Sequence, residues 1–301
     1  MITRVTSQSM SRFAQQNLQS NMERLARLQE AATGQSKITR PSDDPSGTAD
    51  TMRVRADQRA NEQYKRNIDD AAGWLATLDS ALGSATDALH RVRDLAVRSG
   101  SGSVSDTGRE AIALELSALK DELLAAANTR YMGRSVFAGN SDAPAVFAPS
   151  ADGTLNYEFT GPAAGSVERR VDAATTVRVD ADGRDVFGTE AGGDSAFALL
   201  DAMVADLRAG KPVNGYLADI DARLKTVVAQ RAEAGVRHAQ VLRAQEANME
   251  QSVSLEARRS SVEDPDVGQV ILDLKLQEVA YQSALAVTAR VLQPTLMDFL
   301  R

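Results

Sequence analysis

A long apolar seam with a period of about 3.5 residues constrains this sequence more than any other feature. Its members are separated by alternating steps of four and three; they are Tyr64, Ile68, Ala71, Leu75, Leu78, Leu82, Ala85, Leu89, Val92 and Ala96. Such a seam predicts a helix packed lengthwise against other helices. Asp44 followed by Pro45 predicts the helix start, since Asp caps a helix and proline is tolerated at its first position. A helix from there to Ser99 would be roughly 80 Å long at about 1.5 Å per residue.

Other segments offer partners for this helix. Apolar periodicity and flanking breakers predict helices at 7–32, 106–129, 194–208, 216–260 and from Pro265 onward, where Asp264-Pro265 repeats the Asp-Pro start. The seam of 216–260 keeps its period, but many of its members after residue 228 are polar. Polar residues in a seam fix the register of two helices at a cost in stability.

The centre of the chain differs in character. Residues 140–193 are rich in glycine and proline, and short β-type runs occur at Leu155–Thr160, Val167–Val171 and Thr175–Val179. This composition predicts a small β-rich insert.

These elements form a palindrome, with helices leading to the insert and helices leading back. The predicted fold is mainly α, an elongated coiled-coil and helical-bundle rod with both termini paired at one end. We expect three parts: a terminal coiled coil of 1–40 with 265–301, a long-helix bundle of 41–139 with 194–264, and the β-rich insert of 140–193.

Composition limits the function classes. The formal net charge is −7 with no sustained basic run, which disfavours binding to nucleic acid. The absence of cysteine excludes disulfides and zinc–thiolate sites. No apolar run approaches the ~20 residues that span a bilayer, and no cleavable signal is recognisable at the start, so composition alone suggests a cytosolic protein.

Candidate chemical residues have structural explanations. His90 flanks the long seam and His238 occupies a polar seam position, so neither predicts a metal site. The run from Asp180 to Asp185 has carboxylates spaced as in a calcium loop but lacks its glycine and final glutamate, and we interpret it as a turn between strands. Asp43 and Asp44 fit a helix N-terminus better than a catalytic pair. We therefore expect no enzymatic activity, no metal and no cofactor.

Several motifs together carry a family resemblance. They are Gly34–Pro45 (GQSKITRPSDDP), Gln63–Ile68 (QYKRNI), Leu78–Leu82 (LDSAL), Ala127–Gly133 with Val136–Gly139 (ANTRYMG, VFAG), and Leu296–Leu300 (LMDFL). With these motifs the sequence resembles the flagellin family, and within it the branch of hook–filament junction proteins. Pro294 before the tail motif and Ser101–Ser103 depart from the family pattern.

The resemblance implies a structural subunit of the bacterial flagellum, exported by the type III apparatus without a cleaved signal and assembled outside the cell. The implied partners are copies of the same chain in a ring, hook-associated protein 1, flagellin, and an export chaperone. It implies no nucleic acid and no membrane insertion. The alternatives are a filament subunit and a secreted enzyme or adhesin that binds through residues 140–193.

The terminal helices carry the expected assembly interface. Pairing between Leu18, Met22, Leu25, Leu28 and Ile271, Leu274, Tyr281, Leu285 would leave a second stripe of Val270, Ala284, Val287 and Val291 for neighbouring subunits. Leu292, Leu296, Phe299 and Leu300 extend this interface. The expected caps and loop residues are Pro41, Ser42, Asp43, Asp44, Pro45, Asp264 and Pro265.

Overall fold

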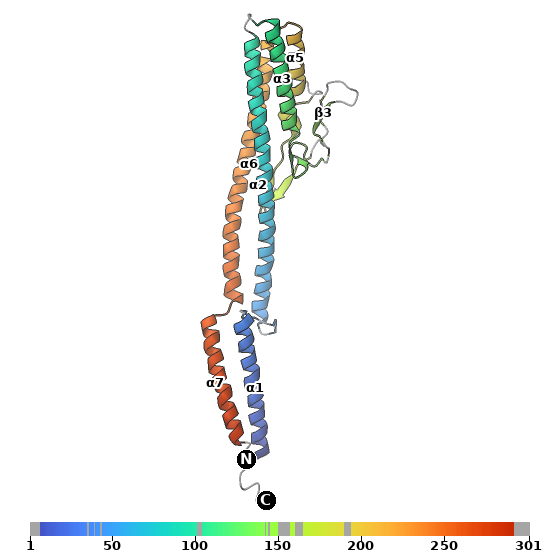
Figure 1. Cartoon of the computed structure of the whole chain (residues 1–301). Coiled ribbons are helices and arrows are strands. Elements are labelled where there is room, and N and C mark those ends of the chain that lie inside the picture. Colours follow the sequence, from blue (N-terminus) through green and yellow to red (C-terminus); the bar gives the residue numbers. More distant parts are fainter. Residues whose placement is uncertain are drawn as a thin grey trace, which may run out of the picture. The chain divides into compact units, whose positions relative to one another are not determined.

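The computed structural model describes residues 7–34, 36–38, 40–42, 44–100, 104–141, 143, 145–149, 157–159, 165–189 and 194–291. Helices dominate the fold (Figure 1). They are α1 (Ser7–Gly34), α2 (Pro45–Ser99), α3 (Asp106–Ala127), α4 (Gly183–Phe187), α5 (Ala196–Arg208), α6 (Leu217–Glu263) and α7 (Val267–Val291), with a 3₁₀ turn at Asn214–Tyr216. The chain divides into two compact units, residues 1–59 with 252–301 and residues 60–251, and each is described by itself. The three-part division expected from the sequence stays a proposal.

The long seam is the centre of the second unit. Its residues from Ile68 to Ala96 are buried, and Tyr64 is half-buried. They join one hydrophobic core with residues of α3, α5 and α6, among them Ile112, Leu116, Leu123, Leu200, Ile220, Val227 and Val241. The predicted helix boundaries of α2 and its role as the packing centre are therefore confirmed.

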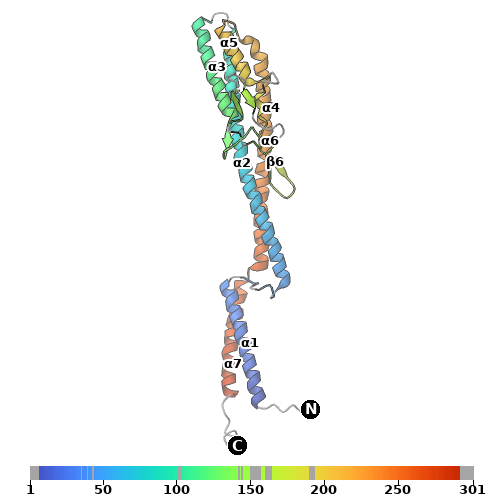
Figure 2. The same ribbon diagram turned by 90° about the vertical axis from the view of Figure 1, so that its right-hand side faces the viewer.

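Ion pairs show how these helices run. Arg93 and Arg231 bind Asp221 (2.7 Å) and Asp79 (2.9 Å), so later residues of α6 meet earlier residues of α2. Lys120 likewise binds Asp201 at 2.7 Å, and Arg208 binds Glu110 at 3.4 Å. Both pairs of helices are thus antiparallel, as a chain that turns back on itself requires, and both views show α3 beside α2 (Figures 1 and 2).

The described residues at the centre of the chain contain three antiparallel two-stranded sheets, two of them in the insert of residues 140–193 and one just before it. They are β1 (Arg130–Tyr131) with β2 (Arg134–Ser135), β3 (Phe147–Pro149) with β4 (Tyr157–Phe159), and β5 (Glu168–Arg170) with β6 (Thr176–Arg178). Their registers place Tyr131 opposite Arg134, Phe147 opposite Phe159, and Arg169 opposite Val177. The insert packs through a cluster of five phenylalanines that touch one another edge-on, tilted or stacked. Phe147, Phe159 and Phe187 come from the insert, while Phe137 precedes it and Phe197 belongs to α5. The β-rich character is confirmed, although each strand is very short.

The run from Asp180 to Asp185 corrects one sequence interpretation. It was expected to be a turn between strands, but Asp182 caps the short helix α4 by accepting the Arg184 amide at 2.9 Å. Asp180 is buried and accepts the Val167 amide at 2.8 Å, which fixes the start of the β5–β6 hairpin. A helix forms because Gly183 lets the backbone approach the carbonyl of Phe137, where an added Cβ would lie 3.1 Å away. Figure 2 shows α4 and β6 in front of α6.

The hairpin is anchored on α2 through one arginine. The guanidinium of Arg169 lies 2.5 Å from the carboxylate of Asp70 and stacks over the ring of Trp74, with 5.6 Å to its centroid. Asn67 donates to the carbonyl of Arg170 at 2.8 Å. An ion pair combined with a cation–π contact favours arginine over lysine at this position.

The starts of α2 and α7 differ in which residue caps them. Asp44 caps α2 as predicted, because its carboxylate accepts the Gly47 amide at 2.9 Å, and these hydrogen bonds lower its pKa. Asp264 was expected to play the same role for α7, but the cap is Asp266, which accepts the Gly268 amide at 2.9 Å and the Gln269 amide at 3.2 Å. The helix therefore begins two residues after Pro265 rather than at it. Pro41 and Ser42 lie in an exposed turn, while Asp43 falls outside the described residues.

Candidate assembly interface

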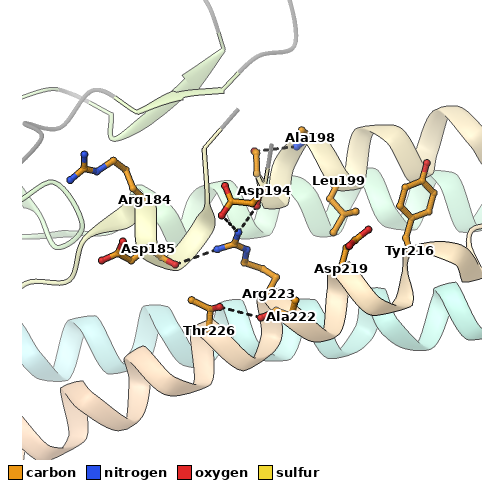
Figure 3. Close-up of a pocket in the computed structure, with 11 residues that line it drawn as sticks. Arg184, Asp185, Asp194, Ala198, Leu199, Tyr216, Asp219, Ala222, Arg223 and Thr226 are labelled. Atoms are coloured by element: carbon orange, nitrogen blue, oxygen red, sulfur yellow. Dashed lines mark hydrogen bonds and ion pairs between the residues drawn. The ribbon is translucent and has the colours of Figure 1, made fainter. Parts of the chain in front are cut away.

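A groove between α5 and α6 is lined by several charged residues and is a candidate for a catalytic or binding site. It measures about 740 Å³, and Arg223 crosses its floor (Figure 3). The Arg223 guanidinium donates to the carbonyls of Val186 at 3.1 Å and of Asp194, and to the Asp194 carboxylate at 2.8 Å. Partial burial raises the pKa of Asp194, but hydrogen bonds from the Thr189 amide and from Arg223 outweigh it and hold the pKa below its ordinary value.

The other polar groups of this groove also serve the fold. The Ser195 hydroxyl accepts the Ala198 amide as the cap of α5. The Tyr216 hydroxyl donates to Asp206 at 2.8 Å, which raises the pKa of Tyr216. These contacts hold α4 and the start of α5 against α6, so the polar groups of the groove stabilise the packing of these helices.

The histidines and acidic residues do not gather into a site. His90 is exposed on α2, and His238 is half-buried on α6. The described part of the chain holds no group of three or more Asp, Glu or His side chains placed to bind a metal ion. Among these same residues, no helix has the length and apolar character to cross a bilayer.

The pair formed by α1 and α7 holds most of the residues expected at an assembly interface. The two helices pack against each other along their length. Gln277 donates to the carbonyl and the side-chain oxygen of Asn21 at 3.2 and 3.3 Å, and a groove of about 570 Å³ between the helices brings Ala14 near Thr288. Early residues of α1 therefore meet late residues of α7, and the pair is antiparallel as predicted.

The packed faces differ in part from the predicted ones. The less exposed positions follow steps of four and three: Ala14, Leu18, Asn21, Leu25, Leu28 and Ala32 on α1, and Val270, Leu274, Gln277, Tyr281, Ala284 and Thr288 on α7. Met22, which was expected in the seam, is 53% exposed, and Ile271 and Leu285 are also exposed. Val270 and Ala284, which were assigned to the outer stripe, instead lie in the packed face. Reading every seam position regardless of polarity would have found Asn21 and Gln277.

The outer face of α7 stays apolar and uncovered in the single chain. Leu272, Leu276, Val279 and Val287 are each more than half exposed, with Leu276 and Val279 at 61%. At about 100° per residue Leu272, Leu276 and Val279 point away from the face that meets α1, whereas Val287 lines the groove between α1 and α7. This row differs from the stripe expected from the sequence, of whose described side chains only Val287 is largely exposed. The side chain of Val291 and all of Leu292, Pro294, Leu296, Phe299 and Leu300 lie outside the described residues.

Comparison with known proteins shows that this chain is similar to flagellar proteins. Residues 5–142 match the bacterial flagellin N-terminal helical region. Flagellar hook-associated protein 3 of Salmonella typhimurium is 25% identical over 307 residues, covering 93% of this chain and 94% of that protein. A flagellar filament 30.7 kDa core protein of Treponema maltophilum is 29% identical over 274 residues, covering 91% and 88%.

A solved structure shows the same fold. The flagellar junction protein of Legionella pneumophila aligns with a TM-score of 0.59 at 18% identity, over 71% of this chain and 100% of that one. The N-terminal half of the chain thus matches the bacterial flagellin helical region, and the chain as a whole is similar to flagellar hook-associated protein 3.

Proposed function

We propose that this protein is a structural subunit of the junction layer between the flagellar hook and the filament. The similarity to flagellar proteins supports a structural role in the bacterial flagellum. The finer assignment rests on one observation: the similarity to hook-associated protein 3 extends over nearly the whole of both chains. In this proposal the subunit contacts hook-associated protein 1 on one side and flagellin on the other, and it forms a ring with its own copies.

The route to that position is also part of the proposal. The subunit is secreted through the type III export apparatus with the help of a flagellar chaperone, and it acts as a building block without enzymatic activity. Its residues divide as the sequence suggests, into terminal helices, a long-helix bundle and a β-rich insert.

The uncovered face of α7 supplies the subunit contact. Burying an aliphatic side chain contributes about 1.5–3 kcal/mol, so a row of exposed leucines and valines favours a partner that covers it. The corresponding outer face of α1 carries Arg12, Glu23, Arg27 and Glu30. A charged face opposes burial, and for this reason we assign the subunit contact to α7 rather than to α1.

A filament subunit is the second candidate function. The similarity to the filament core protein of Treponema maltophilum favours it, since that match also spans most of both chains. The two functions differ in the number of copies: a junction protein forms one short layer, whereas a filament subunit polymerises along the whole filament. The adhesin alternative has less support, because Phe147 and Phe187 of the insert are buried and Phe159 is half-buried, so these rings are not displayed on the surface.

Fluorescence microscopy of a labelled protein tests the proposal. The chain has no cysteine, so Ala173→Cys at the exposed tip of the β5–β6 hairpin gives one labelling site. We expect one focus at the boundary of hook and filament. Label distributed along the filament would contradict the junction assignment and favour the filament subunit.

A further inference from the structure

Two short linkers join the terminal helices to the rest of their unit. Residues 264–266 connect α6 to α7, and residues 35–44 connect α1 to α2. The linker of residues 35–44 contacts the last residue of α6, because the Lys37 amide donates to the Glu263 carbonyl at 2.7 Å. The last carbonyls of a helix have no partner within it, so one linker satisfies the end of the helix that leads into the other.

The side chain of Glu263 adds two ion pairs to this backbone contact. Glu263 is 6% exposed, and its two carboxylate oxygens bind different helices. One oxygen accepts from Arg55 of α2 at 2.7 Å, and the other accepts from Arg259 of α6 at 3.1 Å. A buried carboxylate needs such partners, since an unpaired charge away from water is costly.

A second layer of contacts surrounds the carboxylate. Arg259 also binds Glu256 at 2.8 Å and Asp264 at 3.4 Å, and Glu256 accepts from Gln58 of α2 at 3.0 Å. In the other linker, Ile38 packs at the first turn of α2, where a Cβ on Gly47 would lie 2.7 Å from its Cδ1 atom. Each linker therefore contacts a long helix beside it, since Asp264 binds Arg259 near the end of α6 and Ile38 lies at the start of α2.

Glu263 makes contacts through three different groups. Its carbonyl holds Lys37, and its two carboxylate oxygens hold Arg55 and Arg259. Buried ion pairs contribute little net stability compared with apolar packing, and their best-attested role is to specify one arrangement. The three contacts of Glu263, which reach three different segments of the chain, fit the role of specifying one arrangement.

We propose that Glu263 is a positioning residue that ties the two linkers together, so that α1 and α7 are carried on α2 and α6 as one element instead of on two independent connections. This inference rests on the proposed function, since it concerns how the assembly helices are presented. Its test uses the purified monomer, so a wrong cellular location would refute the proposed function and leave this inference standing.

Hydrogen exchange of the Lys37 amide directly measures how often its hydrogen bond to the Glu263 carbonyl opens. In Glu263→Ala the last turn of α6 loses both side-chain anchors, and we expect this amide to exchange at least about tenfold faster through local opening. Glu263→Gln keeps the shape of the side chain and loses its charge, so its exchange rate should fall between those of the native protein and the alanine variant. Glu256→Gln is the matched control, because it removes an exposed partner of the same Arg259, and its exchange should match the native protein.

Trp74 separates a local effect from general destabilisation. It is the single tryptophan of the chain and lies in the other compact unit. We expect its thermal unfolding transition to be the same in all four proteins. Native-like exchange in Glu263→Ala, equal acceleration in Glu256→Gln, or a shifted Trp74 transition would each overturn the proposal. If the alanine variant does not fold, the glutamine variant decides by the same criteria.

Discussion

Asn61 and Asn248 exchange hydrogen bonds across the antiparallel pair of α2 and α6. Each side-chain amide donates to the backbone carbonyl of the other residue, at 3.1 Å from Asn61 and at 2.9 Å from Asn248. Asn248 also donates to the side-chain oxygen of Asn61 at 2.8 Å. Because these bonds form in only one alignment, the pair opposes sliding of one helix along the other.

Removing one partner should therefore cost stability. In Asn248→Ala the carbonyl and the side-chain oxygen of buried Asn61 lose the amide that donates to them, and we expect the free energy of unfolding to fall by about 1–3 kcal/mol. Urea unfolding followed by Trp74 fluorescence measures this loss. Gln63→Ala is the control, since Gln63 is exposed and bonds within its own helix to Asn67. Equal stability of the two variants would show that the asparagine pair has no such role.

A charge on the outer face of α7 should block assembly without unfolding the helix. In Leu276→Glu the new carboxylate stays hydrated in the monomer, but it would have to lose water in a subunit contact. We expect incorporation into flagella to fall about tenfold or more, with unchanged circular dichroism of the monomer. Gln282→Glu places the same charge at an exposed polar position of α7. If Leu276→Glu is incorporated into flagella as efficiently as the native protein, the outer face of α7 is not part of the subunit interface.

The linker contact should weaken at acidic pH. Burial raises the pKa of Glu263, but hydrogen bonds from Arg55 and Arg259 outweigh it and hold the pKa below its ordinary value of 4.5. The folded state thus binds this proton more weakly than the unfolded state does, so the stabilisation is present at neutral pH and is lost as the pH falls below about 4.5. Glu256, Asp264 and Lys37 also face this region.

Comparing two proteins isolates the Glu263 contribution from those neighbours. Lys37 amide protection, measured between pH 7 and pH 3 and corrected for intrinsic exchange, should fall with acid in the native protein. In Glu263→Gln it should be low throughout and depend less on pH. Parallel curves for the two proteins would assign the pH dependence to other groups.

The sequence predicted the parts of this fold that are set by strong periodicity. The seam of α2 has one apolar stripe flanked by charges, so only one face could be buried, and Pro45 and Ser99 mark its ends. On α7, apolar residues surround the helix, and the sequence alone could not tell that Val270 faces α1 while Ile271 faces solvent. Polar members such as Gln277 were missed because they were not counted as seam residues.

The short elements depend on contacts from distant parts of the chain. The helix α4 follows from the close approach of Gly183 to the Phe137 carbonyl, and that contact exists only in the folded insert. The cap of α7 also escaped the sequence argument, since Asp264 and Asp266 flank the same proline and both fit a cap. The Asn61–Asn248 and Glu263 contacts join residues about two hundred positions apart, so no local pattern announces them.

Deleting residues 296–301 tests the tail motif that carries part of the family resemblance. The core of the second unit contains none of these residues, so the Trp74 unfolding transition should stay unchanged. If the motif forms part of the contact with neighbouring flagellar proteins, cells that make the shortened protein should assemble hooks without attached filaments. Electron microscopy counts the filaments, and replacing only Arg301 by alanine is the control that leaves the apolar residues in place. Filaments of normal number on cells with the deletion would exclude these residues from the proposed interface.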